Sequence, residues 1–416
     1  MKFDISHETY KKSTDIHGTV LYPAVMVAPV QKEVLTWLID GRKNLKIFDP
    51  FHGSGTALYE AADIDSSVAV YGYDINPLAS LITRVKLQGI DEKSFDQDYE
   101  KLVKILNDKK EYPVLSFYKS DKWFKPEVLI TLSKVSYAIK QIDNTLNRKF
   151  FWVMLCDIVR KYSNTRSSTY KLYIKEQASI DALKNNIIKD FLSKVKNSHF
   201  YYKKHFNNFE LTKGDSLKLM KQKEDNSIDI IITSPPYGEN ATTVSYGQFS
   251  YLQLSFIDKK DLDLDGWELN NCQIIDSSSM GGTYAKQELN DYGKKLITTY
   301  LKKITKDKHR KVIRFFSDYF EFLDEAARVA NQYIVMTLGN RTVNRVKINL
   351  TGVTEKYLQS KGYIRKDKLS RKISSKRTPN QILVNNKMTE TMNKEYVLIM
   401  EKGKNSSTFM SKRGNL

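Results

Sequence analysis

Short apolar runs and helical patterns alternate in two blocks of the chain, one near its start and one in its second half. Residues 230–233 are apolar or β-branched, and the run stops at Pro235 and Pro236. Such a run is typical of a parallel strand buried on both faces, and proline ends it because proline has no N–H to donate to a sheet. We expect strands at 45–48, 68–73, 209–213, 230–233, 332–339 and 395–401, and helices at 56–62, 315–330 and 354–362. The pattern predicts an α/β fold.

The part of the chain between the two blocks has a different pattern. Strand signals disappear, and apolar residues recur at helical spacing in runs such as 126–147 and 150–162. We therefore expect a mostly helical insertion for target recognition or partner binding. In the second block, the polar stretch at 258–285 predicts a mobile excursion rather than a packed element. The expected division is a first core block at 1–90, the insertion at 91–205, a second core block at 206–402 and a disordered tail at 403–416.

The composition favours a polyanionic partner. The 416 residues include 67 Lys and Arg against 48 Asp and Glu, a formal net charge of +19. Such an excess favours nucleic acid, although coding bias and ordinary solvated surface also produce basic chains. Cys156 and Cys272 lack Cys-x-x-Cys spacing, so neither a disulfide framework nor a metal site is expected. We expect no membrane contact and a cytoplasmic location, because no apolar run reaches the roughly 18 residues of a spanning helix and the N-terminus lacks the apolar core of a signal peptide.

A glycine-rich phrase at 49–56 follows the first expected strand and opens a helix. Gly53 and Gly55 permit backbone angles closed to other residues and let a ligand approach the main chain. The helix N-terminus behind them favours a negative group such as a carboxylate. No Gly-Lys-Ser/Thr follows, and the third glycine of the dinucleotide fingerprint is absent, so the phrase is neither a phosphate-binding P-loop nor a complete dinucleotide motif.

Asp74 ends the second expected strand, at a distance from the glycine loop that fits one βαβ unit. An acidic residue there can accept both ribose hydroxyls of an adenosine. Aspartate also caps helices, here ahead of Pro77, and the two roles can coexist. His17 lies in the segment that leads to Tyr22, and we interpret it as a structural or capping residue rather than a catalyst.

Three motifs resemble those of S-adenosylmethionine-dependent amino-methyltransferases, which methylate exocyclic amines of DNA bases. They are Ser-Pro-Pro-Tyr at 234–237, Asp-Pro-Phe-x-Gly-Ser-Gly-Thr at 49–56 and Gly-Asp-Ser at 214–216. The resemblance covers the two core blocks and implies a Rossmann-like methyltransferase sheet with helices on both faces. It assigns catalysis to Ser234, Pro235, Pro236 and Tyr237, and cofactor binding to Asp49, Pro50, Phe51, Gly53, Ser54, Gly55, Thr56, Asp74, Asp215 and Tyr22.

The resemblance implies direct transfer from S-adenosylmethionine to an exocyclic amine of a base flipped out of double-stranded DNA. The Ser234 hydroxyl and the Pro235 carbonyl would accept the two amine hydrogens, so that the nitrogen lone pair attacks the sulfonium methyl in line. Tyr237 would stack on the base. Catalysis would come from positioning and preorganised acceptors, without a metal.

Serine at the first loop position is more typical of N4-cytosine enzymes, and aspartate or asparagine of N6-adenine enzymes. We therefore expect N4-cytosine methylation, with N6-adenine as the alternative. Cytosine C5 chemistry needs a cysteine nucleophile, and neither cysteine follows a proline in a strand-end loop. An RNA guanine-N2 methyltransferase and a non-catalytic DNA-binding protein are the remaining alternatives.

Basic and aromatic residues outside these motifs are candidates for DNA contact. Arg166 and Lys171 lie in a stretch that mixes cationic, hydroxyl and aromatic side chains, which suits phosphates and exposed bases. Tyr246 follows the Ser-Pro-Pro-Tyr loop and is placed to cover a target base. Lys376 and Arg377 belong to a basic loop that could clamp a backbone, and a solvated loop is the simpler interpretation of each stretch. A cognate restriction endonuclease is a candidate protein partner.

Overall fold

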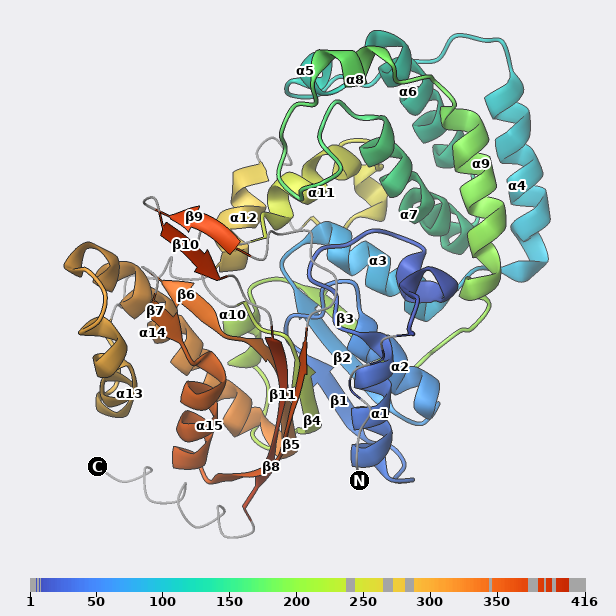
Figure 1. Cartoon of the computed structure of the whole chain (residues 1–416). Helices are drawn as coiled ribbons and strands as arrows, with labels where there is room; N and C mark the ends of the chain where they lie inside the picture. The colour runs from blue at the N-terminus through green and yellow to red at the C-terminus, as the bar shows by residue number, and fades with distance from the viewer. Residues whose placement is uncertain are drawn as a thin grey trace.

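A seven-stranded sheet lies at the centre of the part of the chain that the computed structural model describes, which comprises residues 5, 7, 9–236, 244–264, 272–280, 288–343, 346–372, 381–384, 387–390 and 394–403 (Figure 1). The strand order is β3-β2-β1-β4-β5-β11-β8, in which β11 is antiparallel to both neighbours and the other pairs are parallel. The strands are β1 (Lys46–Asp49), β2 (Ala69–Asp74), β3 (Phe209–Lys213), β4 (Ile228–Thr233), β5 (Ala330–Gly339), β8 (Tyr363–Lys372) and β11 (Lys394–Lys402).

Helices cover both faces of this sheet, which confirms the predicted Rossmann-like α/β fold (Figure 1). Ile230 and Ile232 of β4 pack in one apolar cluster, whereas Ile231 between them belongs to a second cluster. All three are fully buried, as expected for a parallel strand with helices on both sides. The first cluster includes residues of α1 (Ala28–Ile39), α2 (Thr56–Ile64) and α3 (Pro77–Gln88), and the second includes residues of α14 (Lys306–Val329) and α15 (Leu350–Ser360).

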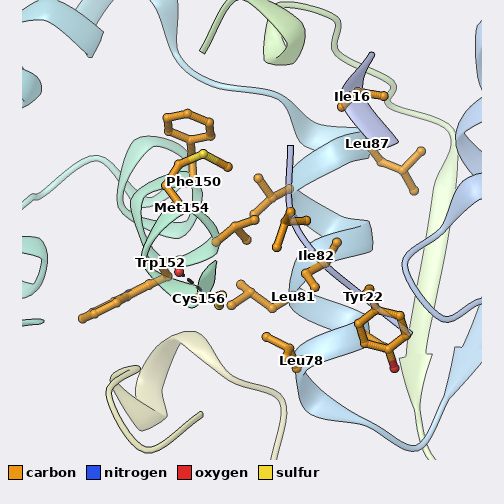
Figure 2. Close-up of a cluster of buried hydrophobic side chains, with 14 of the residues drawn as sticks. Ile16, Tyr22, Leu78, Leu81, Ile82, Leu87, Phe150, Trp152, Met154 and Cys156 are labelled. Atoms are coloured by element: carbon orange, nitrogen blue, oxygen red, sulfur yellow. Dashed lines mark hydrogen bonds between the residues drawn. The ribbon is translucent and has the colours of Figure 1, made fainter. Parts of the chain in front are cut away.

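Helices fill most of the segment between α3 and β3. They are α4 (Glu92–Asn107), α5 (Ser120–Trp123), α6 (Pro126–Lys140), α7 (Thr145–Tyr162), α8 (Gln177–Asp181) and α9 (Ile187–Ser198). The run at 126–147 is divided, because α6 ends at Lys140 and the Asn144 side chain caps α7 by accepting from the N–H groups of Leu146 and Asn147. Figure 2 shows apolar side chains of α7 and α3 in one cluster, with Cys156 close to Leu81 and with Trp152 directed away from α3. The domain boundaries at 90 and 205 stay a prediction.

The expectation that residues 258–285 contain no packed element was wrong. Helix α12 (Cys272–Met280) packs against α11 (Tyr246–Leu254), and Ile275 is buried. The Asp276 carboxylate accepts from the N–H groups of Gly247 at 2.7 Å and Gln248 at 3.3 Å. N–H groups in the first turn of a helix have no partner within that helix, so the Asp276 carboxylate satisfies them and fixes the polar helix α12 against α11.

The remaining elements lie around the second core block. They are α10 (Ser216–Met220), α13 (Asp291–Leu301), the hairpin of β6 (Arg341–Val343) and β7 (Val346–Ile348), and the hairpin of β9 (Gln381–Val384) and β10 (Lys387–Glu390). Short 3-10 helices at Lys12–Thr14, Ile16–Gly18, His199–Tyr202 and Lys259–Asp261 lie elsewhere along the described chain. Within the described ranges, no helix is long and apolar enough to cross a bilayer.

A buried ion pair joins the helical segment to the chain that follows α11. Arg148 of α7 donates to both oxygens of Asp261, at 2.8 and 2.9 Å, and the indole N–H of Trp152 donates at 2.8 Å. Burial alone would raise the pKa of Asp261, but these hydrogen bonds outweigh it and hold the pKa below its ordinary value.

We expect Asp261→Ala to lower the free energy of unfolding by about 3–5 kcal/mol, because it leaves a largely buried arginine unpaired. The matched control is Asp263→Ala. Asp263 pairs with Arg84 and is more exposed than Asp261, so its loss should cost less than about 1 kcal/mol. Urea denaturation of the three proteins measures both effects, and equal losses would contradict the assignment.

Candidate cofactor and catalytic site

The two predicted site loops leave the sheet from neighbouring strands. Ile47 and Phe48 of β1 pair with Ile230 and Ile231 of β4. The strand order reverses between these strands, because β2 and β3 lie beyond β1 and β5 lies beyond β4. In open α/β sheets, ligands bind outside the carboxyl ends of the strands at such a switch point. The fold therefore brings the glycine loop and the Ser-Pro-Pro segment to this position.

A buried hydrogen bond links the ends of the two strands. The Thr233 hydroxyl donates to Oδ1 of Asp49 at 2.6 Å, and the same oxygen accepts from the Phe51 N–H at 3.0 Å. Both Asp49 and Thr233 are fully buried, and Oδ2 of Asp49 has no hydrogen-bond partner among the described residues. Burial raises the pKa of Asp49 to about 7; the bonds from Thr233 and Phe51 oppose this increase, and nearby Asp74 adds to it.

The glycine loop is folded around the Asp74 carboxylate. Oδ2 of Asp74 accepts from the Gly53 N–H at 2.9 Å, and Oδ1 accepts from the Asn76 N–H at 2.8 Å. Gly53 and Gly55 have φ values of +52° and +74°, in the left-handed region that favours glycine. Asp74 thus shapes the loop and its following turn, and each carboxylate oxygen keeps a second lone pair for a ligand hydroxyl.

Tyr22 lies against this loop: a Cβ added to Gly53 would be 3.5 Å from Cε1 of the Tyr22 ring. The sequence did not identify Asn76 as a site residue, although it donates to the Tyr22 hydroxyl at 3.1 Å and to Ser250 of α11 at 2.8 Å. Burial raises the pKa of Tyr22 well above its ordinary value, so the hydroxyl stays neutral. Asn76 therefore joins the end of β2, the N-terminal segment and α11.

The other predicted cofactor residues surround the same loop. The Pro50 carbonyl accepts from the Ser216 hydroxyl, and the Phe51 ring packs on Phe322 of α14. Asp215 caps α10 by accepting from the N–H groups of Leu217 and Lys218, and its role in cofactor binding stays a prediction. The buried Ser54 and Thr56 lie where α2 begins, and the Thr56 hydroxyl has no hydrogen-bond partner among the described residues.

The candidate DNA-contacting residues divide into three groups. Tyr246 begins α11, with its ring centroid 6.0 Å from that of Tyr22, which itself lies against the glycine loop. Arg166 is exposed and Lys171 half-buried on a turn between α7 and α8, which is joined to α11 because the Leu172 N–H donates to the Gln248 side chain at 3.2 Å. Lys376 and Arg377 lie outside the described residues, as do the catalytic candidate Tyr237 and the tail after residue 403.

Two sequence expectations concern groups outside this site. His17 is buried, with Nε2 2.8 Å from Oε1 of Glu60, and both line a cleft of about 520 Å³ that contains none of the predicted site residues. Cys156 is buried in α7, and burial raises the pKa of its thiol, which disfavours a nucleophilic thiolate. Within the part of the chain described here, no group of His, Cys, Asp and Glu is arranged to hold a metal ion.

Comparison with known proteins finds a relative over nearly the whole chain. The sequence is 28% identical over 424 residues to the Type II methyltransferase M.MvaI of Kocuria varians, an alignment that covers 94% of this chain and 92% of the relative. No family model matches the chain. At this coverage the helical segment is largely included in the alignment, and the similarity supports the resemblance to methyltransferases that the motifs indicate.

We expect Asp49→Asn to be more stable than the wild type at alkaline pH. A buried carboxyl with a pKa near 7 costs stability as pH rises from about 4 to 7, because the folded chain holds the proton more tightly than the unfolded chain. The advantage of the variant should grow by about 2–3 kcal/mol between pH 5 and pH 8. Urea denaturation at both values measures this difference, and an advantage that does not change with pH would contradict it.

Proposed function

We propose that this chain is a site-specific DNA methyltransferase that transfers a methyl group from S-adenosylmethionine to an exocyclic base amine, cytosine N4 by preference. The observation that carries the proposal is the meeting of two motif loops at one sheet edge, with Thr233 bonded to Asp49 between them. The similarity to a Type II methyltransferase along 94% of the chain supports the same function.

The described residues fit S-adenosylmethionine. The cofactor carries an ammonium and a sulfonium, and the buried Oδ2 of Asp49 offers an acceptor without a hydrogen-bond partner among the described residues. Asp74 lies at the end of β2, where a carboxylate can accept ribose hydroxyls while it still holds the Gly53 N–H. The glycine loop and the N-terminus of α2 suit the carboxylate of the same molecule. When bound, this cofactor would supply a methyl group already activated by its sulfonium: the S–CH3 bond breaks as the N–CH3 bond forms, a neutral thioether leaves, and the methylated amine releases one proton to solvent.

The chain's own contribution would be to position the base amine. An exocyclic amine is a poor nucleophile because its lone pair is delocalised into the ring. The Ser234 hydroxyl and the Pro235 carbonyl would accept hydrogen bonds from its two N–H groups and so favour a tetrahedral nitrogen. The two prolines, whose φ angles are fixed, would hold these acceptors in place. Tyr237 would stack on the flipped base. Pro235 is buried and Pro236 half-buried directly after β4, so the segment is anchored to the sheet.

Cytosine is preferred over adenine because Ser234, rather than aspartate or asparagine, begins the motif. The net charge of +19 favours binding to duplex DNA, to which Arg166, Lys171, Tyr246, Lys376 and Arg377 would contribute. In a restriction-modification system, a cognate restriction endonuclease would be the protein partner.

We expect Ser234→Ala to lower the transfer rate at least about 100-fold, because a preorganised acceptor is lost, and to change cofactor affinity by less than about twofold. Asp74→Ala should instead weaken cofactor binding by about tenfold or more. Transfer of labelled methyl groups to duplex DNA and calorimetric titration with the cofactor measure the two effects separately.

The matched control is Ser227→Ala, at the opposite end of β4, where the hydroxyl donates only locally to the Glu224 carbonyl. This variant should keep wild-type transfer and cofactor affinity. Full activity of Ser234→Ala would remove Ser234 from the catalytic site.

A further inference from the structure

Two side chains of α3 donate hydrogen bonds to consecutive carbonyls of the glycine loop. The Thr83 hydroxyl donates to the Gly53 carbonyl at 3.0 Å, and Nζ of Lys86 donates to the Ser54 carbonyl at 2.7 Å. Residues three apart lie on the same face of a helix, so both donors come from adjacent turns of α3. Neither residue belongs to the motifs that the sequence singled out.

Thr83 and Lys86 are enclosed where they meet the loop. Thr83 is fully buried and Lys86 is 1% exposed. The contact is also close, since a Cβ on Gly55 would lie 2.4 Å from the Thr83 methyl carbon. Glycine at this position is therefore required both by its φ of +74° and by the approach of α3.

These bonds fix the orientation of two peptide planes. In a trans peptide, the carbonyl and the following N–H point in opposite directions. Because the Gly53 carbonyl is turned toward Thr83, the Ser54 N–H points away from α3. The Gly55 N–H is directed in turn to the His52 carbonyl, to which it donates at 2.7 Å. The loop thus directs the Ser54 N–H to its side opposite α3. There it is a single backbone donor for an anionic group, because the Gly53 and Gly55 N–H groups are already bonded to Asp74 and to the His52 carbonyl.

Lys86 adds a positive charge behind the loop. Burial lowers its pKa to about 7; the neighbouring Lys12 acts in the same direction, whereas Asp15 and Glu60 oppose it. Nδ1 of His17 lies 3.4 Å from Nζ, and burial holds the pKa of His17 well below its ordinary value, so this ring is neutral at pH 7. The Lys86 charge is therefore present at acidic pH and is lost as pH rises through about 7.

The helical segment holds α3 in this position. Leu78 and Leu81 of α3 belong to the same apolar cluster as Phe150, Met154 and Cys156 of α7 (Figure 2). Asp157 of α7 also accepts from the Leu21 N–H at 2.9 Å, beside Tyr22. The helical segment consequently supports both α3 and the N-terminal segment that packs on the loop.

We propose that Thr83 and Lys86 are positioning residues that orient the glycine loop to bind the carboxylate of the cofactor, a role that rests on the proposed function. Thr83 sets the direction of the Ser54 N–H together with His52, whose Nδ1 lies 2.9 Å from the same Gly53 carbonyl. Lys86 supplies a positive charge that would compensate the charge of the cofactor carboxylate. The helical segment, by holding α3, is part of the cofactor site as well as a candidate DNA-contacting region.

The test is calorimetric titration of the full chain with two stable probes at pH 6.5. S-adenosylhomocysteine carries the amino-acid carboxylate, and methylthioadenosine lacks it. We expect Thr83→Val and Lys86→Met to weaken S-adenosylhomocysteine binding about fivefold or more, with methylthioadenosine affinity unchanged. Thr83→Ser, which keeps the hydroxyl, should restore wild-type affinity. Thr354→Val is the matched control, because it removes a buried threonine hydroxyl in α15 on the opposite face of the sheet.

The pH dependence distinguishes orientation of the loop from general destabilisation. The ratio of wild-type to Lys86→Met affinity for S-adenosylhomocysteine should fall as pH rises from 6 to 8.5. Wild-type affinity in both α3 variants, or an equal loss for both probes, would overturn this inference. A wild-type protein that binds neither probe would overturn the proposed cofactor use itself.

Discussion

The hydrogen bond from Thr233 to Asp49 is the contact on which the site depends. It joins the last residues of two adjacent parallel strands in a place that water does not reach. The glycine loop begins on one side of this bond and the Ser-Pro-Pro segment on the other. An ionised carboxyl at such a depth costs stability unless it is compensated, which is why burial raises the pKa of Asp49 to about 7.

A second layer of support comes from α3 and the helices that follow it. Thr83 and Lys86 hold the loop carbonyls from behind, Asn76 ties the end of β2 to Tyr22 and Ser250, and α7 packs on α3. The helical segment therefore packs directly on elements that surround the glycine loop. Its turn at Arg166 and Lys171 is joined to α11 through Gln248.

The sequence predicted the strands and loops that carry strong local signals. The buried run at 230–233, the glycine loop and the acidic end of β2 were each located, because burial on both faces and positive φ restrict residue choice. Strand β8 was missed, since an edge strand rich in Lys and Arg resembles a solvated loop. Helix α12 was not predicted because its sequence is polar and a tertiary contact, from Asp276 to α11, fixes it in place. Thr83, Lys86 and Asn76 were not predicted because their hydrogen-bond partners lie far away along the chain.

Expression of the chain in a host that lacks DNA methylation, followed by mass spectrometry of nucleosides from the host DNA, tests the central claim most directly. The account predicts N4-methylcytosine in DNA from cells that express the wild type and none in DNA from cells that express Ser234→Ala. N6-methyladenine would keep the site and change the base. Absence of any methylated base, with expression and cofactor binding verified, would contradict the account.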